Sequence, residues 1–233
     1  MFQDRKVSVV APAYNEEEYV SEAVRDFKSS EYVDEVVIVD NNSTDRTAEL
    51  ARKAGARVVL EKRQGYGFAC RRALDEARGE YIILVEPDGT FTAKDVIKFL
   101  AYSEDFDLIL GTRTSKELIW KGANMGSFLR WGNVFLGRII TILHNGPHLS
   151  DVGCTYRLIK KPALKKIQKK FTVGSSSFSP EMMILAIKSR LKTVEIPVNY
   201  KPRKGKSKIT GEKKKAFRLG LVMIKLILSY ILK

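Results

Sequence analysis

The sequence predicts an α/β fold: a mostly parallel β-sheet flanked by helices, with an amphipathic helix at the C-terminal end. Three observations lead to this prediction. Short apolar runs alternate with segments of helical periodicity through the first half of the chain. Two of these runs end directly in carboxylates, at Asp40 and at Glu86-Pro87-Asp88. The last apolar segment is interrupted by Arg218 and Lys225, at a spacing that places both on one helical face.

The first half of the chain predicts a regular β–α order. Buried strands are expected at residues 7–11, 36–39, 57–60, 81–85 and 107–110. Helices are expected at residues 16–27, 45–54, from the turn at 64–67 to about 79, and at 93–101. Asn15 is expected to cap the first helix, and Ser43 or Thr44 the second. This alternation favours a parallel sheet, because parallel strands need a crossover connection.

The second half is less regular. We expect a long or broken helix at 123–143, loop and strand at 150–159, a helix at 179–188, a strand at 192–198 and a basic loop at 202–211. No internal repeat and no long linker divides the chain. We therefore predict one domain over residues 1–211, followed by a separate amphipathic helix over 212–233.

Composition indicates a globular protein with one substantial core. The chain has 233 residues, of which 44% are hydrophobic and 29% charged. Cys70 and Cys154 lie far apart without a C-x-x-C pattern, which favours a reducing, cytosolic compartment and argues against a zinc site. The first strand begins at Val7, which leaves no room for a signal peptide.

The net charge of +14 is unevenly distributed. Residues 201–233 hold eleven Lys or Arg and one acid, and residues 157–170 hold six lysines and no acid. Such clusters suggest an anionic partner, although a solvated lysine-rich surface is the plainer interpretation. We do not expect nucleic acid to be the partner, because few aromatic side chains are interleaved with the charges for base stacking.

The C-terminal segment predicts a helix in a membrane interface. Its apolar stretch at 217–232 is shorter than the ~20 residues that span a bilayer. Lys214, Arg218, Lys225 and Ser229 share one helical face, and the other faces are apolar. The alternative is an ordinary terminal helix packed on the domain. We expect the protein at the cytoplasmic face of a membrane, either peripheral or anchored by a segment beyond this chain.

The carboxylates at the strand ends predict a ligand site. In open parallel sheets, ligands bind beyond the carboxyl ends of the strands. Glu86 and Asp88 are hard oxygen ligands suited to Mg2+ or Mn2+, and such a metal usually also holds phosphates. The alternatives are structural: Pro87-Asp88-Gly89 favours a turn, and Asp40 can cap the turn that follows it.

Several segments resemble the motifs of family-2 glycosyltransferases, in the family's order. They are Pro12-Ala13-Tyr14-Asn15-Glu16, the run from Asp40 to Asp45, and Gly65-Tyr66-Gly67, and Glu86-Pro87-Asp88 stands where that family places its D-x-D. Residues 203–208 resemble the R-x-x-G-x-S-K segment of the polyprenyl-phosphate branch, typified by dolichyl-phosphate mannose and glucose synthases. The resemblance implies a GT-A fold, the Rossmann-like fold of nucleotide-diphospho-sugar transferases, with residues 1–211 as the catalytic domain.

The resemblance also implies an activity: an inverting, metal-dependent hexosyltransferase that moves a hexose from a UDP- or GDP-sugar to a polyprenyl or dolichyl phosphate. Asp88 and Glu86 would hold the Mg2+ or Mn2+ ion, with Glu86 replacing the usual first aspartate. The nucleotide-binding residues would be Pro12, Ala13, Tyr14, Glu16, Asp40, Asn42, Gly65 and Glu86. A nucleotidyltransferase would instead be expected to have a glycine-rich, lysine-bearing loop after the first strand.

The acceptor decides which further residues matter. A phosphate acceptor is already ionised at pH 7 and needs positive charge rather than a base. The candidates for binding it are Arg157, Arg203, Lys206, Ser207 and Lys208. A saccharide or protein hydroxyl must lose a proton, and Asp151 and Glu181 are the candidate bases for that alternative. The predicted catalytic residues are thus Asp88, Arg203 and Asp151.

Overall fold

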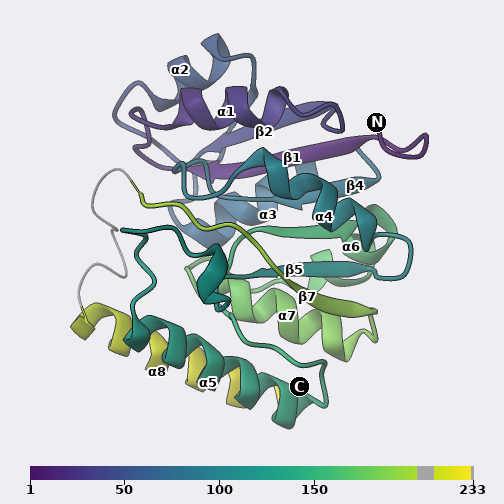
Figure 1. Ribbon diagram of the computed structural model, residues 1–233, viewed down its shortest axis with the longest axis vertical. Helices are drawn as coiled ribbons and strands as arrows, with labels where there is room; N and C mark the ends of the chain where they lie inside the picture. Colours follow the sequence, from purple (N-terminus) through teal and green to yellow (C-terminus); the bar gives the residue numbers. More distant parts are fainter. Residues whose placement is uncertain (204–212, 232–233) are drawn as a thin grey trace.

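A seven-stranded sheet forms the centre of the protein in the computed structural model, which describes residues 1–203 and 213–231 (Figure 1). The strand order is β3-β2-β1-β4-β6-β5-β7, and β6 alone runs antiparallel to its neighbours in the described sheet. The strands are β1 Val7–Ala13, β2 Glu35–Asp40, β3 Arg57–Leu60, β4 Tyr81–Leu84, β5 Leu108–Thr112, β6 Arg157–Lys160 and β7 Thr193–Pro197. The predicted α/β class with a mostly parallel sheet is confirmed.

Helices cover both faces of this sheet. They are α1 Val20–Lys28, α2 Thr47–Lys53, α3 Tyr66–Glu76, α4 Val96–Ala101, α5 Ser127–His144, α6 Lys161–Ile167, α7 Phe178–Lys188 and α8 Lys213–Ser229. Short 3-10 turns are also present: η1 Ala93–Asp95, η2 Lys116–Leu118 and η3 Gln168–Lys170. Helix α6 carries part of the lysine cluster, and the sequence pattern had not indicated it.

The core consists of two apolar layers, one on each face of the sheet. Along β4, Tyr81 and Ile83 point into the layer beneath α1 and α4, while Ile82 and Leu84 point into the layer that contains α3 and α7. A sheet buried on both faces needs apolar residues at consecutive positions. This is why the strands are visible in the sequence as unbroken apolar runs.

Strand β6 begins at the carboxyl edge of the sheet, because it runs antiparallel to β4 and β5. Arg157, its first residue, pairs with Leu84 at the end of β4 and with Leu110 near the end of β5. The preceding loop, residues 149–156, therefore lies at the same edge as the predicted ligand site. The sequence predicted loop and strand here, but it did not predict the direction of the strand.

Helix α8 packs on the domain beside α5. Met223, Ile227 and Tyr230 are buried in the same apolar layer as α7, and the His144 ring lies 3.2 Å from the Ile227 carbonyl oxygen. Both helices run in the same direction along one side of the molecule (Figure 1). No helix among the described residues is both long and apolar enough to cross a bilayer. The division into domains at residue 211 stays a prediction, although α8 shares the core of the preceding residues.

Two predicted helix caps are wrong. Helix α1 begins at Val20, and the Asn15 side chain instead accepts a hydrogen bond from the Thr44 amide at 2.8 Å. At the start of α2, the Asp45 carboxylate rather than Ser43 or Thr44 accepts from the Thr47 amide, at 2.9 Å. Asn15 adopts φ of 53°, which asparagine tolerates better than most residues. The contact between Asn15 and Thr44 joins the loops after β1 and β2 at the carboxyl edge.

Candidate active site

Asp88 lies just beyond the end of β4, with only 4% of its surface exposed. Its Oδ1 accepts hydrogen bonds from the Thr90 amide at 3.1 Å and the Thr90 hydroxyl at 2.6 Å. Its Oδ2 lies 3.2 Å from Nη1 of Arg203. One oxygen therefore shapes the predicted turn, and the other faces a cation.

Arg203 connects this aspartate to the loop after β1. Its Nη2 donates to both carboxylate oxygens of Glu16, at 2.8 and 3.0 Å. The structure thus brings together three residues that the sequence predicted separately: Glu16 for nucleotide binding, Asp88 for metal binding and Arg203 for acceptor binding. The other predicted residues of that segment, Lys206, Ser207 and Lys208, lie outside the described residues.

Glu86 is half-buried beside Asp88, and its pKa is raised to about 7. Burial is the main cause and the charge of Asp88 adds to it, while the charges of Arg113 and Arg203 act in the opposite direction. Two carboxylates that repel one another at a buried strand end favour a bound cation. The Arg203 guanidinium supplies positive charge at this position.

This arrangement fits a divalent metal of the kind that bridges protein and phosphate. Among the described residues, no group of three or more His, Cys, Asp or Glu side chains is placed to hold a metal ion. Mg2+ typically binds one or two carboxylates and takes its remaining ligands from water and substrate phosphates. Asp88 and Glu86 match this pattern, rather than that of an all-protein metal cage.

The predicted nucleotide-binding residues lie on the neighbouring strand ends. Ala13 pairs with Asp40 across β1 and β2, so the two lie side by side at the edge. Asp40 is buried and its Oδ1 accepts from the Ser43 amide at 3.3 Å, so one oxygen does cap the following turn. Pro12 is buried in β1, whereas the Tyr14 ring is exposed. Asn42 uses its side-chain amide to donate to the Lys62 carbonyl at 2.7 Å.

The glycine turn has a different local environment from the one the sequence suggested. The Gly65 amide donates to Oδ1 of Asn41 at 2.8 Å, and the Gly67 amide donates to the Gly174 carbonyl at 2.9 Å. A Cβ atom on Gly65 would lie 2.4 Å from the Gly174 oxygen. Both amides are therefore used within the protein, and Gly65 permits close packing of the 173–175 loop.

Sequence reasoning missed Asn41, a buried residue that holds this turn in place. Its side-chain nitrogen donates to the carbonyls of Glu61 at 2.9 Å and Arg63 at 2.8 Å, while its oxygen accepts from Gly65. The available signal was its position, directly after the strand-terminal Asp40. Asn41 fixes the connection between β3 and α3 against the end of β2.

Arg157 is brought to the same sheet edge but is buried beneath it. Nη1 donates to the Ser179 carbonyl at 3.1 Å, and Nη2 donates to the Cys154 carbonyl. Burial lowers its pKa. Among the described residues, no hydrogen bond or ion pair joins Arg157 to Asp88 or Arg203. Its carbonyl partners hold the guanidinium in the interior, and its predicted role in binding an acceptor phosphate stays a prediction.

Besides Asn41, sequence reasoning also missed Arg113. It directly follows β5, and its backbone amide and Nε each donate to Oδ2 of Asp151 at 2.8 Å, while Nη2 donates to Oδ1 at 2.9 Å. Its guanidinium carbon lies 5.0 Å from the centre of the Tyr200 ring. Because β5 runs parallel to β4 within the sheet, Arg113 lies at the same carboxyl edge as Glu86, and its charge acts against the rise in the pKa of Glu86. The signal in the sequence was a cation just after a buried strand.

The two candidate bases are both fully buried and hydrogen-bonded. Asp151 has the Arg113 contacts and a further one from the Gly153 amide at 3.1 Å. Glu181 accepts from the Thr172 amide at 2.8 Å, the Thr172 hydroxyl at 2.7 Å and the Tyr230 hydroxyl at 2.7 Å. In this conformation, neither carboxylate is exposed to an acceptor.

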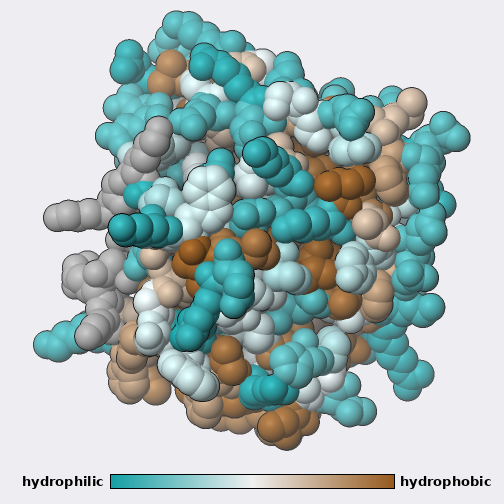
Figure 2. Space-filling model, viewed as in Figure 1, coloured by the Kyte–Doolittle hydropathy of each residue, from teal (hydrophilic) through white to brown (hydrophobic). Residues whose placement is uncertain are grey.

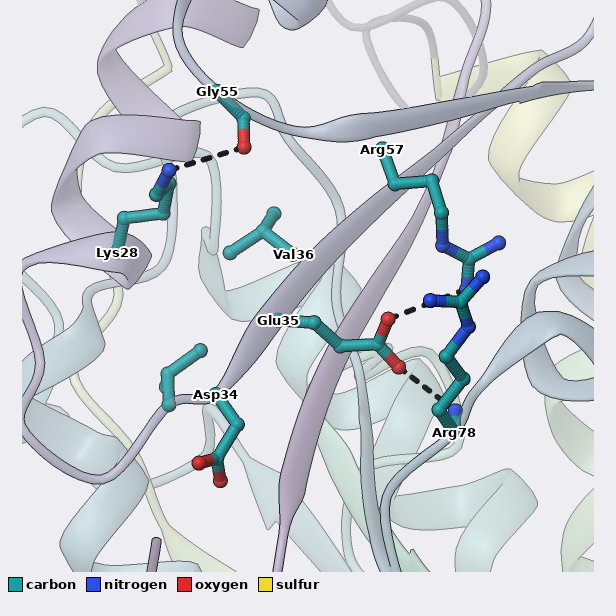
Figure 3. A pocket seen from close by; sticks show the side chains of 8 residues that line it. Lys28, Asp34, Glu35, Val36, Gly55, Arg57 and Arg78 are labelled. Atoms are coloured by element: carbon teal, nitrogen blue, oxygen red, sulfur yellow. Dashed lines mark hydrogen bonds and ion pairs between the residues drawn. The ribbon is translucent and has the colours of Figure 1, made fainter.

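A small cavity lies elsewhere, at the amino end of the strands (Figure 3). Its volume is about 250 Å³, and Lys28, Asp34, Glu35, Arg57 and Arg78 are among the residues that line it. Glu35 opens β2 and Arg78 precedes β4, so the cavity is at the edge opposite to Asp88. It is therefore separate from the candidate site.

Comparison with protein families now defines the class. The family described as "Glycosyl transferase family 2" matches residues 8–168, which include all but the first residue of β1, strands β2 to β6 and the acids at the strand ends. The chain belongs to this family. It is a family-2 glycosyltransferase, as the sequence motifs indicated.

Curated relatives agree with this assignment. The chain is 31% identical over 206 residues to a dolichyl-phosphate hexose transferase of Haloferax volcanii, covering 87% of this chain and 86% of that protein. It is 30% identical over 199 residues to the glycosyltransferase AglJ of the same organism, covering 84% of this chain. It spans only 63% of the length of AglJ and 49% of another relative from that organism, a low-salt glycan biosynthesis hexosyltransferase.

Solved structures confirm the predicted GT-A fold. The glucosyl-3-phosphoglycerate synthase of Mycobacterium tuberculosis in complex with phosphoglyceric acid superimposes with a TM-score of 0.76 at 19% identity, covering 98% of this chain and 80% of that one. The same synthase with Mn2+, UDP and glucosyl-3-phosphoglycerate gives a TM-score of 0.76 at 18% identity, again covering 98% and 80%. At this identity, the likeness establishes the fold.

Proposed function

We propose that this protein transfers a hexose from a UDP- or GDP-sugar to a polyprenyl or dolichyl phosphate, in a reaction that requires Mg2+ or Mn2+. The observation that carries the proposal is the position of Arg203 between Glu16 and Asp88. Arg203, the first residue of the basic motif, contacts the acids at the strand ends. One site therefore combines carboxylates for a metal-bound diphosphate with a cation for a second phosphate.

The donor would be held by the strand-end residues. Asp88 and Glu86 would hold the metal, which when bound would offset negative charge on the departing nucleoside diphosphate. Asp40 would accept an N–H of uracil or guanine, because a carboxylate is a strong acceptor at the end of a buried strand. The exposed Tyr14 ring would form one wall of the nucleotide pocket.

The acceptor phosphate would be oriented by Arg203, whose guanidinium can pair with two oxygens at once. Lys206, Ser207 and Lys208 are proposed to add to this contact. Arg113 lies near Glu86 and would add positive charge to the same region. No base is needed on this route, since the attacking phosphate oxygen is already ionised.

The lipid carrier requires the site to work at a membrane. We propose that α8 lies at the cytoplasmic surface of that membrane, because Leu221 and Leu228 are exposed beside Arg218 and Lys225. The name of the Haloferax dolichyl-phosphate hexose transferase supports a lipid-phosphate acceptor.

The alternative acceptor is a saccharide or protein hydroxyl, with Asp151 or Glu181 as the base. The structure offers this alternative less support, because each carboxylate is fully buried and accepts several hydrogen bonds from within the protein. A base must reach the proton that it removes.

The test is a transfer assay with matched acceptors. Labelled UDP-glucose and GDP-mannose are supplied with Mn2+ to a short polyprenyl phosphate, to the corresponding polyprenol, and to 3-phosphoglycerate. We expect labelled lipid only from the polyprenyl phosphate, and none after chelation of the metal. Equal transfer to the polyprenol, or transfer to 3-phosphoglycerate alone, would contradict the proposal.

A further inference from the structure

Helix α5 has an apolar stripe on its exposed face. Phe128, Trp131, Phe135 and Ile142 recur at steps of three, four and seven residues, so they lie on one side of the helix. Trp131 is 68% exposed and Ile142 is 76% exposed. The face that packs on the protein is apolar as well, since Leu136 and Ile140 are buried. A helix that is apolar on its exposed face indicates an interaction surface.

Helix α8 extends this surface. Leu221, Val222 and Leu228 are exposed, whereas Met223 and Ile227 are buried against the domain. Because α5 and α8 lie side by side, the two exposed stripes form one surface, here called the apolar ridge. Apolar side chains gather along the lower edge of the molecule in Figure 2, where Figure 1 places these two helices.

Positive charges are interleaved with the ridge. Arg138 is exposed on α5, within the stripe between Phe135 and Ile142, and Arg218 and Lys225 are exposed on α8. The sequence contains no Asp or Glu from residue 118 to residue 150, and none from 213 to 233. The charge of this surface therefore has one sign.

We propose that the apolar ridge, with α5 as well as α8, inserts into the interface of an anionic lipid bilayer. Aromatic side chains favour the headgroup region, and basic side chains pair with anionic lipids there. A second copy of the chain fits the surface less well, because a symmetric contact would bring Arg138, Arg218 and Lys225 against like charges. The inference extends the membrane contact proposed above from α8 to α5. Its test contains no transfer assay, so that either proposal can fail without the other.

The first experiment uses a tryptophan of the ridge as the reporter. The chain has two tryptophans, so Trp120→Phe leaves Trp131 as the only one. Phosphatidylcholine vesicles with and without phosphatidylglycerol are added to this variant. We expect a blue shift of the Trp131 emission and quenching by brominated acyl chains, both stronger with phosphatidylglycerol. Emission that does not change while the protein co-sediments with vesicles would overturn the role of α5.

The second experiment compares ridge variants with a matched control. Trp131→Ser combined with Phe135→Ser should weaken co-sedimentation of the full chain with anionic vesicles by about tenfold or more. Arg138→Glu should weaken it on anionic vesicles only. Ile97→Ser combined with Tyr102→Ser, which changes two exposed apolar residues at α4, should bind as the wild type does. Thermal melting checks that each variant is folded.

Two results would overturn the inference. One is wild-type vesicle binding by the folded Trp131→Ser/Phe135→Ser variant. The other is a wild-type protein that binds no vesicles and that light scattering shows to be a dimer, when the same double substitution converts this dimer into monomers. The second result would identify the ridge as a contact between copies of this chain.

Discussion

The two halves of the carboxyl edge hold their acids in different ways. At the ends of β1 and β4, Glu16 and Asp88 share one long side chain, that of Arg203. Near β5 and β7, Asp151 and Glu195 each accept from two backbone amides: Asp151 from those of Arg113 and Gly153, in addition to the Arg113 guanidinium, and Glu195 from those of Ser150 and Asp151. Amide donors are fixed once the chain folds, whereas an arginine side chain can exchange its partner for a ligand. We propose on this basis that Glu16 and Asp88 bind substrate, whereas Asp151 and Glu195 shape the site.

The largest expected effect is on transfer by Asp88→Asn. Loss of this charge should reduce the rate of hexose transfer by about 10²- to 10³-fold, because charge on the leaving diphosphate is no longer offset. The melting temperature should change little. Asp105→Asn, which removes an exposed aspartate after α4, serves as the control and should keep full activity. Full activity in the folded Asp88→Asn variant would show that the metal assignment is wrong.

Asp151→Asn should act on stability first. Asp151 is fully buried and Arg113 largely so, and removing one partner of a buried ion pair typically costs about 3–5 kcal/mol, because the other charge is left without its partner. Urea unfolding measures this loss, and initial rates corrected for the folded fraction measure activity. If Asp151 is instead the base of a hydroxyl transfer, activity would vanish while the free energy of unfolding stays near the wild-type value.

Arg203→Ala should raise the affinity of the protein for the metal ion and lower its affinity for the acceptor phosphate. In the absence of nucleotide, Mn2+ should bind more tightly to the variant, because Asp88 and Glu16 lose their positive partner. Titration calorimetry or the electron paramagnetic resonance signal of free Mn2+ measures this. Arg63→Ala, which removes an exposed arginine paired with Glu61, is the control. Weaker Mn2+ binding by Arg203→Ala would contradict the proposal that the Arg203 guanidinium and the metal ion compete for the Asp88 carboxylate.

The smallest expected effect is a pH dependence of stability due to Glu195. Burial raises the pKa of this carboxyl to about 7, against the lowering effect of its hydrogen bonds to Ser150 and Asp151. The native state then holds a proton that the unfolded state releases above its ordinary pKa of 4.5. Stability should therefore fall as pH rises from about 4.5 to 7, with a slope of at most about one proton. Glu195→Gln should reduce the slope in this part of the profile, to which Glu86 also contributes, and an unchanged profile would contradict the assignment.

The fold and half of the site could be predicted because their signals are local. Apolar runs identify buried strands, and a carboxylate directly after such a run must lie at the sheet edge, as Asp40 and Asp88 do. The direction of β6 depends on pairing with two strands distant in the sequence, so no local pattern encodes it. Gly65 gives the same signal whether it approaches a phosphate or a backbone carbonyl. Whether a basic residue is buried or exposed, as with Arg157, depends on the carbonyls that the fold places around it.

The central claim is that one site holds two phosphate groups, one through Asp88 and the other through Arg203. The most direct test is the steady-state kinetics of Arg203→Ala with both substrates varied. The account predicts a lower kcat/KM for polyprenyl phosphate, with the KM of the nucleotide sugar unchanged. A higher KM for the nucleotide sugar, with unchanged kinetics toward the lipid phosphate, would contradict it.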